Sequence, residues 1–189
     1  MSKIWLSAIL AGMLSSNVFG AVYNIDKIHS SVDFSVSHMS VSKVNGSFSE
    51  FEGMVDINPK TKNLVNLEGW ISIDKIDTRN SKRDEHLLGA EYLDASNFPK
   101  GMLKSTKIIK DKKGLKVEAD LTLKGITKKV ILTGQINGPV DNPKTKKETW
   151  GLSLEGKINR KDFGIAKDTS GITMGEQVTI LINLELHAD

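Results

Sequence analysis

Apolar and polar residues alternate along most of this chain with a period of two. Between residues 31 and 38 the apolar positions include Val32, Phe34 and Val36, and a polar residue stands on each side of them. Later runs repeat this pattern, with apolar faces at Val65, Leu67, Gly69, Ile71 and Ile73, at Leu115, Val117, Ala119, Leu121 and Leu123, and at Val178, Ile180, Ile182, Leu184 and Leu186. Such alternation is typical of strands with one buried and one solvent-facing side, which belong to antiparallel rather than parallel sheets.

The pattern predicts about eight strands joined mostly by short turns. They are expected at residues 29–38, 46–57, 63–74, 102–110, 115–124, 128–137, 148–159 and 176–187. The joins contain turn residues such as Asn45-Gly46 and Asn58-Pro59. Eight antiparallel strands with one apolar face can close into a barrel, which removes the exposed sheet edges. A barrel of this size holds either packed side chains or one small ligand.

Two connections are too long for hairpin turns. Residues 75–101 contain a helical pattern from Ser81 to Leu93, with Ser81 as the expected cap, so we predict one short helix there. Residues 159–175 form the second long connection. A loop of that length in a compact domain is usually functional or covers a site.

The N-terminal residues 1–20 have the composition of a secretory signal peptide. A basic residue, Lys3, precedes an apolar run at residues 4–14, and small residues follow up to Gly20. The apolar run is too short to cross a bilayer about 30 Å thick. We therefore expect cleavage after Gly20, with cleavage after Ala21 as the alternative, and a periplasmic location for the remainder.

Residues 21–189 are expected to form a single domain that does not span a membrane, because no later apolar run is long enough. The chain contains no cysteine, which excludes disulfides, cysteine-ligated metals and a thiol nucleophile. Its formal net charge is only +3, and the lysine-rich stretches fall at predicted turns. Nucleic acid is therefore not an expected partner.

Motifs for catalysis or metal binding are missing from the sequence. The four histidines, His29, His38, His86 and His187, have none of the short spacings of metal ligands, so a metal site would need assembly from distant segments and none is predicted. There is no Gly-x-Ser-x-Gly or Walker motif, and the Asp-Phe-Gly at 162–164 lacks the other kinase motifs. No cofactor and no enzymatic activity are predicted.

The alternation alone leaves the barrel interior undecided. The apolar face mixes wide residues such as Phe34 and Phe48 with glycines such as Gly69 and Gly156, which fits a solid core as well as an open channel. His38 falls on that face, either as a hydrogen-bonded histidine of the core or rim or as a polar contact to a ligand.

Short motifs in a fixed order give the chain a more specific resemblance. They include Asp26-x-x-His29-Ser30 and Asn159-Arg160-x-Asp162-Phe163-Gly164. The matching segments lie at residues 23–38, 46–53, 73–78, 83–87, 97–99, 105–106, 121–128, 158–164 and 178–180. Each segment is weak alone, but together they are spread along nearly the whole of residues 21–189, in order, and resemble the YceI-like family.

The resemblance implies an all-β fold, an eight-stranded antiparallel lipocalin-like barrel with one short helix in a long connection. It also implies an apolar tunnel for a polyisoprenoid, an isoprenoid quinone or a fatty-acid derivative, which the protein would bind, transport or store in the periplasm. A homodimer and transient membrane contact are further expectations. Leu103 departs from the family pattern, in which a phenylalanine is expected before Ser105-Thr106.

The expected ligand contacts combine apolar wall residues with polar groups near the mouth. They are Phe34, Val36, His38, Phe48, Phe51, Met54, Ile71, Ile73, Arg79, Arg83, Asp84, His86, Leu87, Leu88, Tyr92, Phe98, Arg160 and Phe163. For two charged pairs a structural role is an open alternative: Arg83-Asp84 as a helix-surface pair and Arg160-Asp162 as a loop clamp. The alternative function is an enzyme acting on an isoprenoid-type lipid, with His38 and His86 as acid and base.

Overall fold

The structure is a computed structural model that describes residues 20–112 and 114–188. The predicted signal peptide, residues 1–20, lies outside this part except for Gly20. Its cleavage, and a single domain beginning at residue 21, remain predictions.

Strands dominate the described residues, as the alternation predicts. The strands are β1 Ala21–Ile25, β2 Ser31–His38, β3 Ser42–Phe48, β4 Phe51–Asn58, β5 Asn63–Ser72, β6 Ile76–Asp77, β7 Lys100–Asp111, β8 Gly114–Leu123, β9 Ile126–Asp141, β10 Glu148–Asn159 and β11 Met174–His187. The described α-helix is α1, Ser81–Leu87, and two 3₁₀ turns are η1, Ile73–Lys75, and η2, Arg160–Phe163.

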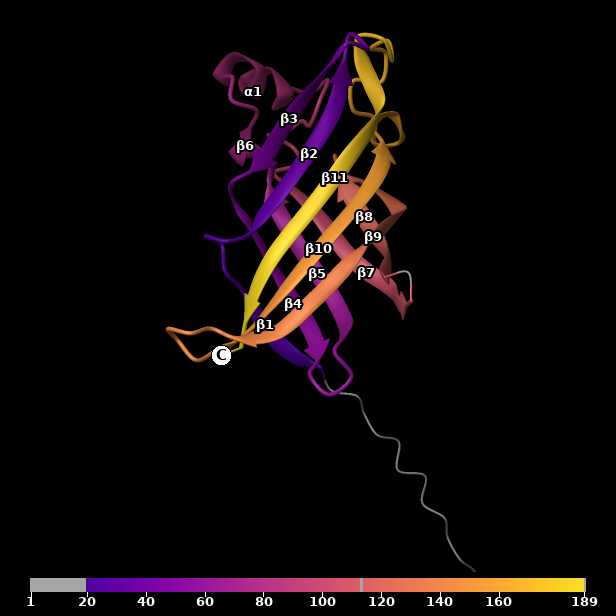
Figure 1. Cartoon of the computed structure of the whole chain (residues 1–189). Helices are drawn as coiled ribbons and strands as arrows, with labels where there is room; N and C mark the ends of the chain where they lie inside the picture. The colour runs from indigo at the N-terminus through magenta and orange to yellow at the C-terminus, as the bar shows by residue number, and fades with distance from the viewer. Residues whose placement is uncertain (1–19, 113, 189) are drawn as a thin grey trace, which may run out of the picture.

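Eight of these strands close on themselves. The neighbours run β1-β4-β5-β7-β8-β9-β10-β11, and β1 pairs back onto β11, every pairing being antiparallel (Figure 1). The closing contact is short, since β1 and β11 share only the pairs Asn24↔His187 and Ile25↔Leu186 in the described chain. The predicted antiparallel barrel is confirmed.

Three further strands extend one end of the barrel. β2 pairs along the other part of β11, β3 pairs with β2, and β6 pairs with β3. This end also carries α1 and is called the upper end here, whereas β1 lies at the lower end (Figure 1).

Several predicted strands are divided in the structure. The strand expected at 46–57 is two strands, β3 and β4, separated at Ser49 and Glu50, and the strand expected at 63–74 ends at Ser72. At the break, the Ser72 backbone N–H donates to Glu50 O, and the Ser49 N–H donates to Lys75 O. At this break the chain crosses between the upper extension, which contains β3, and the closed barrel, which contains β4. The strands on either side of the break pair with different neighbours, and the alternation of apolar and polar residues cannot predict such a change.

One predicted face is wrong at its first residue. Val65 was expected to point inward with Leu67, but Leu64 is buried and Val65 is exposed. The register between β4 and β5 shifts at Asp56 and Ile57, which places Leu64 opposite Ile57. A β-bulge of this kind adds one residue and reverses the side on which the following side chains lie.

The lower end of the barrel is filled by side chains. The Tyr23 and Trp150 rings meet edge to face with centroids 6.2 Å apart, and both are almost fully buried. Leu186 and Ile57 are buried beside the same strand ends. The barrel is therefore closed at this end by packed aromatic and aliphatic residues.

The helix is shorter than predicted and is capped by a different residue. Asn80, rather than Ser81, accepts the first-turn hydrogen bond from the Arg83 N–H, and α1 ends at Leu87 instead of Leu93. The residues from Leu88 continue as turns, beginning with the bond from the Gly89 N–H to His86 O. Within residues 20–112 and 114–188, no helix has the length and apolar character needed to cross a membrane.

Candidate ligand tunnel

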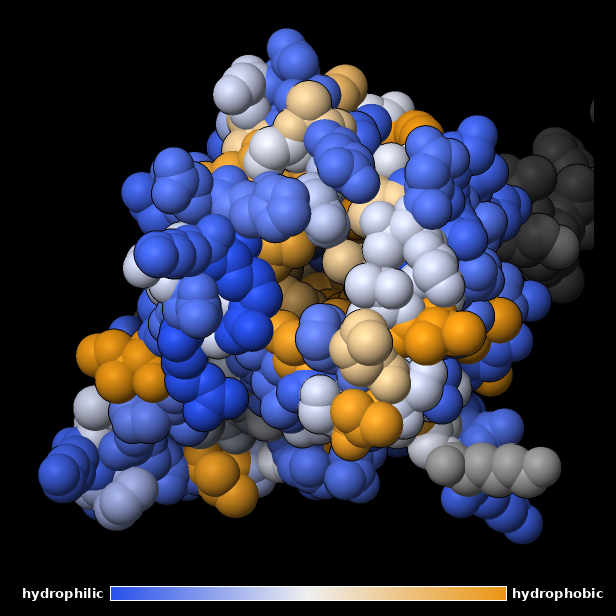
Figure 2. Space-filling view, turned by 90° about the horizontal axis from the view of Figure 1, so that it is seen from above, coloured by the Kyte–Doolittle hydropathy of each residue, from blue (hydrophilic) through white to orange (hydrophobic). Residues whose placement is uncertain are grey.

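A tunnel enters the barrel from its upper end. Its volume is about 380 Å³, within the range of small-molecule pockets. Figure 2 looks down on this end and shows a hollow with apolar walls inside a largely hydrophilic rim. Wall residues come from β2, β4, β5, β7, β8 and β11, among them Phe34, Val36, Phe51, Ile71, Leu103, Leu121, Val178, Ile180 and Ile182.

Missing side chains help to keep the tunnel open on one wall. Gly53 and Gly69 face each other across β4 and β5, and both line the tunnel. A Cβ atom on either glycine would lie 2.7 Å from a backbone carbonyl oxygen, that of Glu68 or of Glu52. The two strands therefore approach closely here, and neither position has room for a larger residue.

The mouth carries several polar side chains above the apolar walls. His38 ends β2, while His86 and Arg83 come from α1. The His86 ring meets the Tyr92 ring edge to face with centroids 4.6 Å apart. An apolar interior with a few polar groups at one end suits a ligand with a long apolar body and a polar head.

Arg83 and Asp84 both bind Thr78, a buried residue just after β6. The Arg83 guanidinium donates to Thr78 Oγ1 and Thr78 O, each at 2.7 Å. Asp84 accepts from the Thr78 backbone N–H at 2.8 Å and from its hydroxyl. These bonds fix α1 over the upper end, and Arg83 in addition lines the tunnel.

Arg160 is almost fully buried at 1% exposure and organises the second long connection. Its guanidinium donates to the backbone carbonyl oxygens of Ile165, Ala166, Thr169, Met174 and Gly175. Burial lowers the pKa of Arg160 from its ordinary value. The loop is thus held by bonds from Arg160 to carbonyl groups rather than by the expected pair with Asp162, and Arg160 also reaches the tunnel.

Eleven of the predicted contact residues line the tunnel. They are Phe34, Val36, His38, Phe48, Phe51, Ile71, Arg83, His86, Leu87, Tyr92 and Arg160. Whether any of them contacts a ligand remains a prediction.

The other seven predicted residues lie elsewhere: Met54, Ile73, Arg79, Asp84, Leu88, Phe98 and Phe163. Met54 follows the inward Gly53 on β4 and is exposed on the outer face, while Arg79 is exposed beyond β6. Ile73 and Phe163 are buried away from the tunnel.

The remaining three are held by local contacts. The ring of Phe98 lies against Gly125, where a Cβ atom would come within 2.5 Å of it. Asp84 binds Thr78, and Leu88 ends α1 as its C-cap.

Some lining residues were not among the predicted contacts. Val178, Ile180 and Ile182 alternate on β11, so the period of two would have identified them. Trp70 and Met102 stand at the outward positions of β5 and β7, and only the folded chain places them beside the tunnel.

A closed antiparallel barrel with an apolar tunnel open at one end is the architecture of a lipocalin-like ligand-binding barrel. The family model for the YceI-like domain matches residues 23–186. This chain therefore belongs to the YceI-like family, and the resemblance inferred from its motifs is confirmed.

Two relatives illustrate the similarity. Protein YceI of Salmonella newport is 33% identical over 189 residues, covering 98% of this chain and 97% of that protein. The crystal structure of the Campylobacter jejuni YCEI protein is 30% identical and superposes with a TM-score of 0.75, over 81% of this chain and 90% of that chain.

More distant structures share the fold alone. Burkholderia cenocepacia BcnA is 22% identical, with a TM-score of 0.70 over 86% of this chain and 99% of that chain. A polyisoprenoid binding domain from Saccharophagus degradans, implicated in plant cell wall breakdown, is 12% identical, with a TM-score of 0.57 over 90% and 99%.

Proposed function

We propose that this protein binds a long-chain amphiphile in its tunnel and carries or stores it in the periplasm. The candidate ligands are a polyisoprenoid, an isoprenoid quinone or a fatty-acid derivative. The observation that carries the proposal is the apolar tunnel with a polar-rimmed mouth at the upper end. The Saccharophagus degradans domain, a polyisoprenoid binding domain with this fold, supports the ligand class. Export is supported by the sequence of residues 1–20.

The tunnel suits such a ligand energetically. Each methylene group removed from water contributes about 0.8 kcal/mol, so a long chain gains enough to offset its ordering inside the protein. His38, Arg83 and His86 stand where the polar head would remain at the mouth. A ligand of this kind is poorly soluble in water, so it needs a carrier protein to cross the aqueous space between two membranes.

The test is to recover the bound ligand from a variant with a blocked tunnel. Val36→Trp places a large ring on the inward face of β2, and Ser35→Trp places the same ring on the outward side as the control. Native mass spectrometry followed by organic extraction should find one lipid per wild-type and Ser35→Trp chain, and a loss of at least tenfold in Val36→Trp. A wild-type protein that is empty and takes up no long-chain prenol, quinone or fatty acid overturns the proposal.

The same preparation tests the enzyme alternative. A binding protein returns added lipid chemically unchanged, whereas an enzyme converts it and loses that activity in His38→Ala or His86→Ala. Light scattering on the same sample tests the expected homodimer.

A further inference from the structure

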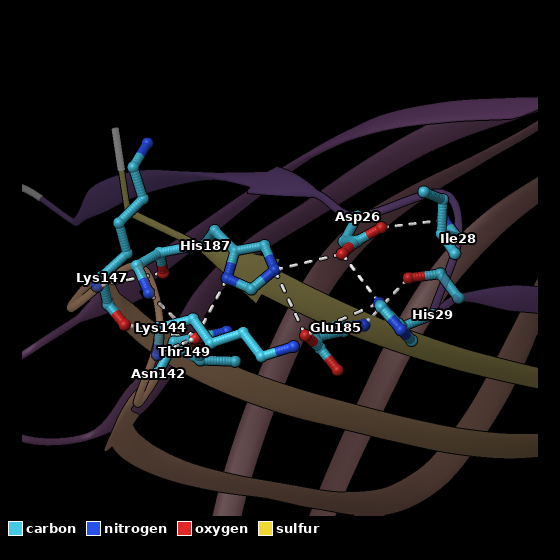
Figure 3. Close-up of polar contacts among 11 residues, drawn as sticks. Asp26, Ile28, His29, Asn142, Lys144, Lys147, Thr149, Glu185 and His187 are labelled. Atoms are coloured by element: carbon cyan, nitrogen blue, oxygen red, sulfur yellow. Dashed lines mark hydrogen bonds and ion pairs between the residues drawn. The ribbon is translucent and has the colours of Figure 1, made fainter.

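Four ionisable side chains meet on the outer surface of the barrel, away from the tunnel. Asp26 and His29 belong to the loop between β1 and β2, and Glu185 and His187 lie on β11 (Figure 3). On β11 the buried positions are Ile182, Leu184 and Leu186, so positions 185 and 187 point outward. The group is called the outer cluster here.

Three members of the outer cluster, Asp26, Glu185 and His187, are spaced like ligands around one small ion. His187 Nε2 lies 3.3 Å from Asp26 Oδ2 and 3.2 Å from Glu185 Oε1, while His29 Nδ1 lies 2.9 Å and 4.0 Å from the same two oxygens. Tetrahedral zinc with bonds of about 2.0–2.1 Å places its ligand atoms ~3.3 Å apart. The two distances from His187 Nε2 agree with that value, and the ligand atoms of Asp26, Glu185 and His187 all lie within 4.8 Å of one another.

A contact outside the outer cluster fixes the orientation of His187. The Thr149 hydroxyl lies 3.0 Å from His187 Nδ1 and also donates to Lys147 O at 3.3 Å. Contact with Thr149 holds the His187 ring so that Nε2 faces the carboxylate oxygens of Asp26 and Glu185. A metal-ligating histidine is usually oriented in this way, by a polar partner at its other ring nitrogen.

We propose that Asp26, Glu185 and His187 form a binding site for a divalent transition metal of the zinc type. One imidazole with two carboxylates, and water in the fourth position, is a donor set for such ions, whereas Ca²⁺ and Mg²⁺ prefer sites made of oxygen alone. The Ile28 backbone N–H donates to Asp26 Oδ1 at 2.8 Å, which leaves Oδ2 directed toward the other ligands (Figure 3).

The metal would act as a bridge at the weakest seam of the barrel. β1 and β11 share only two register pairs in the described chain, and the outer cluster lies beside them. An ion held by Asp26 and His187 would join the loop after β1 to β11. Because metal binds the folded chain and not the dispersed ligands of the unfolded one, it would raise the stability of the closed barrel.

The experiment titrates the purified, metal-free chain with zinc and follows binding by calorimetry and stability by thermal unfolding. We expect one Zn²⁺ per chain and a rise in Tm, with affinity at least tenfold lower in His187→Ala and in the nearly isosteric Glu185→Gln. His86→Ala, at the tunnel mouth, is the matched histidine control and should bind zinc as the wild type does. Thr149→Val should weaken binding by about tenfold, as expected for loss of an orienting partner.

Three outcomes overturn the proposal: no binding, binding that every histidine variant weakens equally, or binding that Glu185→Gln leaves unchanged. If the His187→Ala variant fails to fold, the Glu185→Gln variant still tests the proposal. Because the outer cluster lies outside the tunnel, lipid recovered from His187→Ala, Glu185→Gln and Thr149→Val should match the wild type. The metal proposal and the proposed function can therefore fail separately.

Discussion

Glu148 holds two of the aromatic residues that fill the lower end of the barrel. Its Oε1 accepts from the Tyr23 hydroxyl at 2.6 Å and from Trp150 Nε1 at 2.8 Å, so the polar ends of two buried aromatic rings share a partner. The hydrogen bonds from Tyr23 and Trp150 lower the pKa of Glu148 below its ordinary value of 4.5. The ionised carboxylate is therefore part of the folded structure.

This geometry predicts a pH dependence of stability. A carboxyl group whose pKa is lower in the folded state stabilises the protein above its unfolded pKa, and that contribution is lost as the pH falls below about 4.5. Glu148→Gln should lower the free energy of unfolding at pH 7 and flatten its decline toward acid. Denaturant unfolding at several pH values measures this.

The matched control is Glu155→Gln, an exposed position on the same strand. It should leave both the pH 7 stability and the slope close to wild type. Equal slopes for Glu148→Gln and the wild type would contradict the role given to Glu148.

At the scale of elements, the connection from β10 to β11 depends on one buried side chain. Arg160 reaches carbonyl groups along Ile165 to Gly175, and the planar guanidinium can serve several acceptors that a lysine cannot. The sequence hypothesis of a loop clamp anticipated this role of Arg160 but named Asp162 as its partner. The acceptors are backbone atoms, which leave no trace in the residue types.

Arg160→Lys should therefore loosen this loop. We expect a loss of roughly 2–4 kcal/mol in the free energy of unfolding, because several buried carbonyl groups lose their donor. Hydrogen exchange should speed up across residues 160–175 before the rest of the barrel. Lys161→Met is the control, since it removes only a partly exposed ion pair with Glu176 and should cost less than about 1 kcal/mol. Wild-type exchange rates in Arg160→Lys would refute the clamp.

The bounds of a strand could be predicted from the sequence where one face of that strand is buried along its whole length. The expected strand at 148–159 matches β10 in both bounds, and the expected strand at 115–124 nearly matches β8. β1 was missed, and the strand at 46–57 was not recognised as two. Those segments change partners or bulge, which depends on the neighbouring strands rather than on local periodicity.

At the scale of the whole molecule, the barrel is solid at its lower end and hollow at its upper end. Tyr23 and Trp150 close the lower end, and the tunnel opens between β2, β11 and α1. Exposed apolar residues stand on loops at that end, with Val41 86% and Ile172 66% exposed. The bond from the Met39 N–H to Thr173 O joins those two loops. We propose that they contact a membrane transiently during ligand exchange.

Charging these loops should slow exchange without changing equilibrium binding. In the double variant Val41→Asp, Ile172→Asp, we expect lipid transfer to vesicles to slow several-fold, while the amount of bound lipid stays at the wild-type level. Fluorescence transfer between protein and anionic vesicles measures the rate. Val140→Asp is the control, because that exposed valine ends β9 at the lower end. Equal transfer rates in all three proteins would contradict membrane contact through these loops.

The antiparallel barrel and the family could both be predicted from the order of the amino acids. Alternation such as that of Val32, Phe34 and Val36 is a local property that survives in any register, and the ordered motifs identified the YceI-like family. Which half of the interior is open became apparent only in the folded chain. The open half depends on how side chains from different strands fill a shared volume. Gly53 and Gly69, paired on β4 and β5, have no side chains and leave part of that volume empty.

The outer cluster could not be predicted from the sequence for a related reason. His29 and His187 lie near opposite ends of the sequence of residues 21–189, so no short spacing joins them, and the sequence predicted no metal ligand. Closure of β1 onto β11 brings their loop and strand together. Periodicity tells which way a side chain points within its own strand, but contacts between distant segments exist only once the barrel has closed.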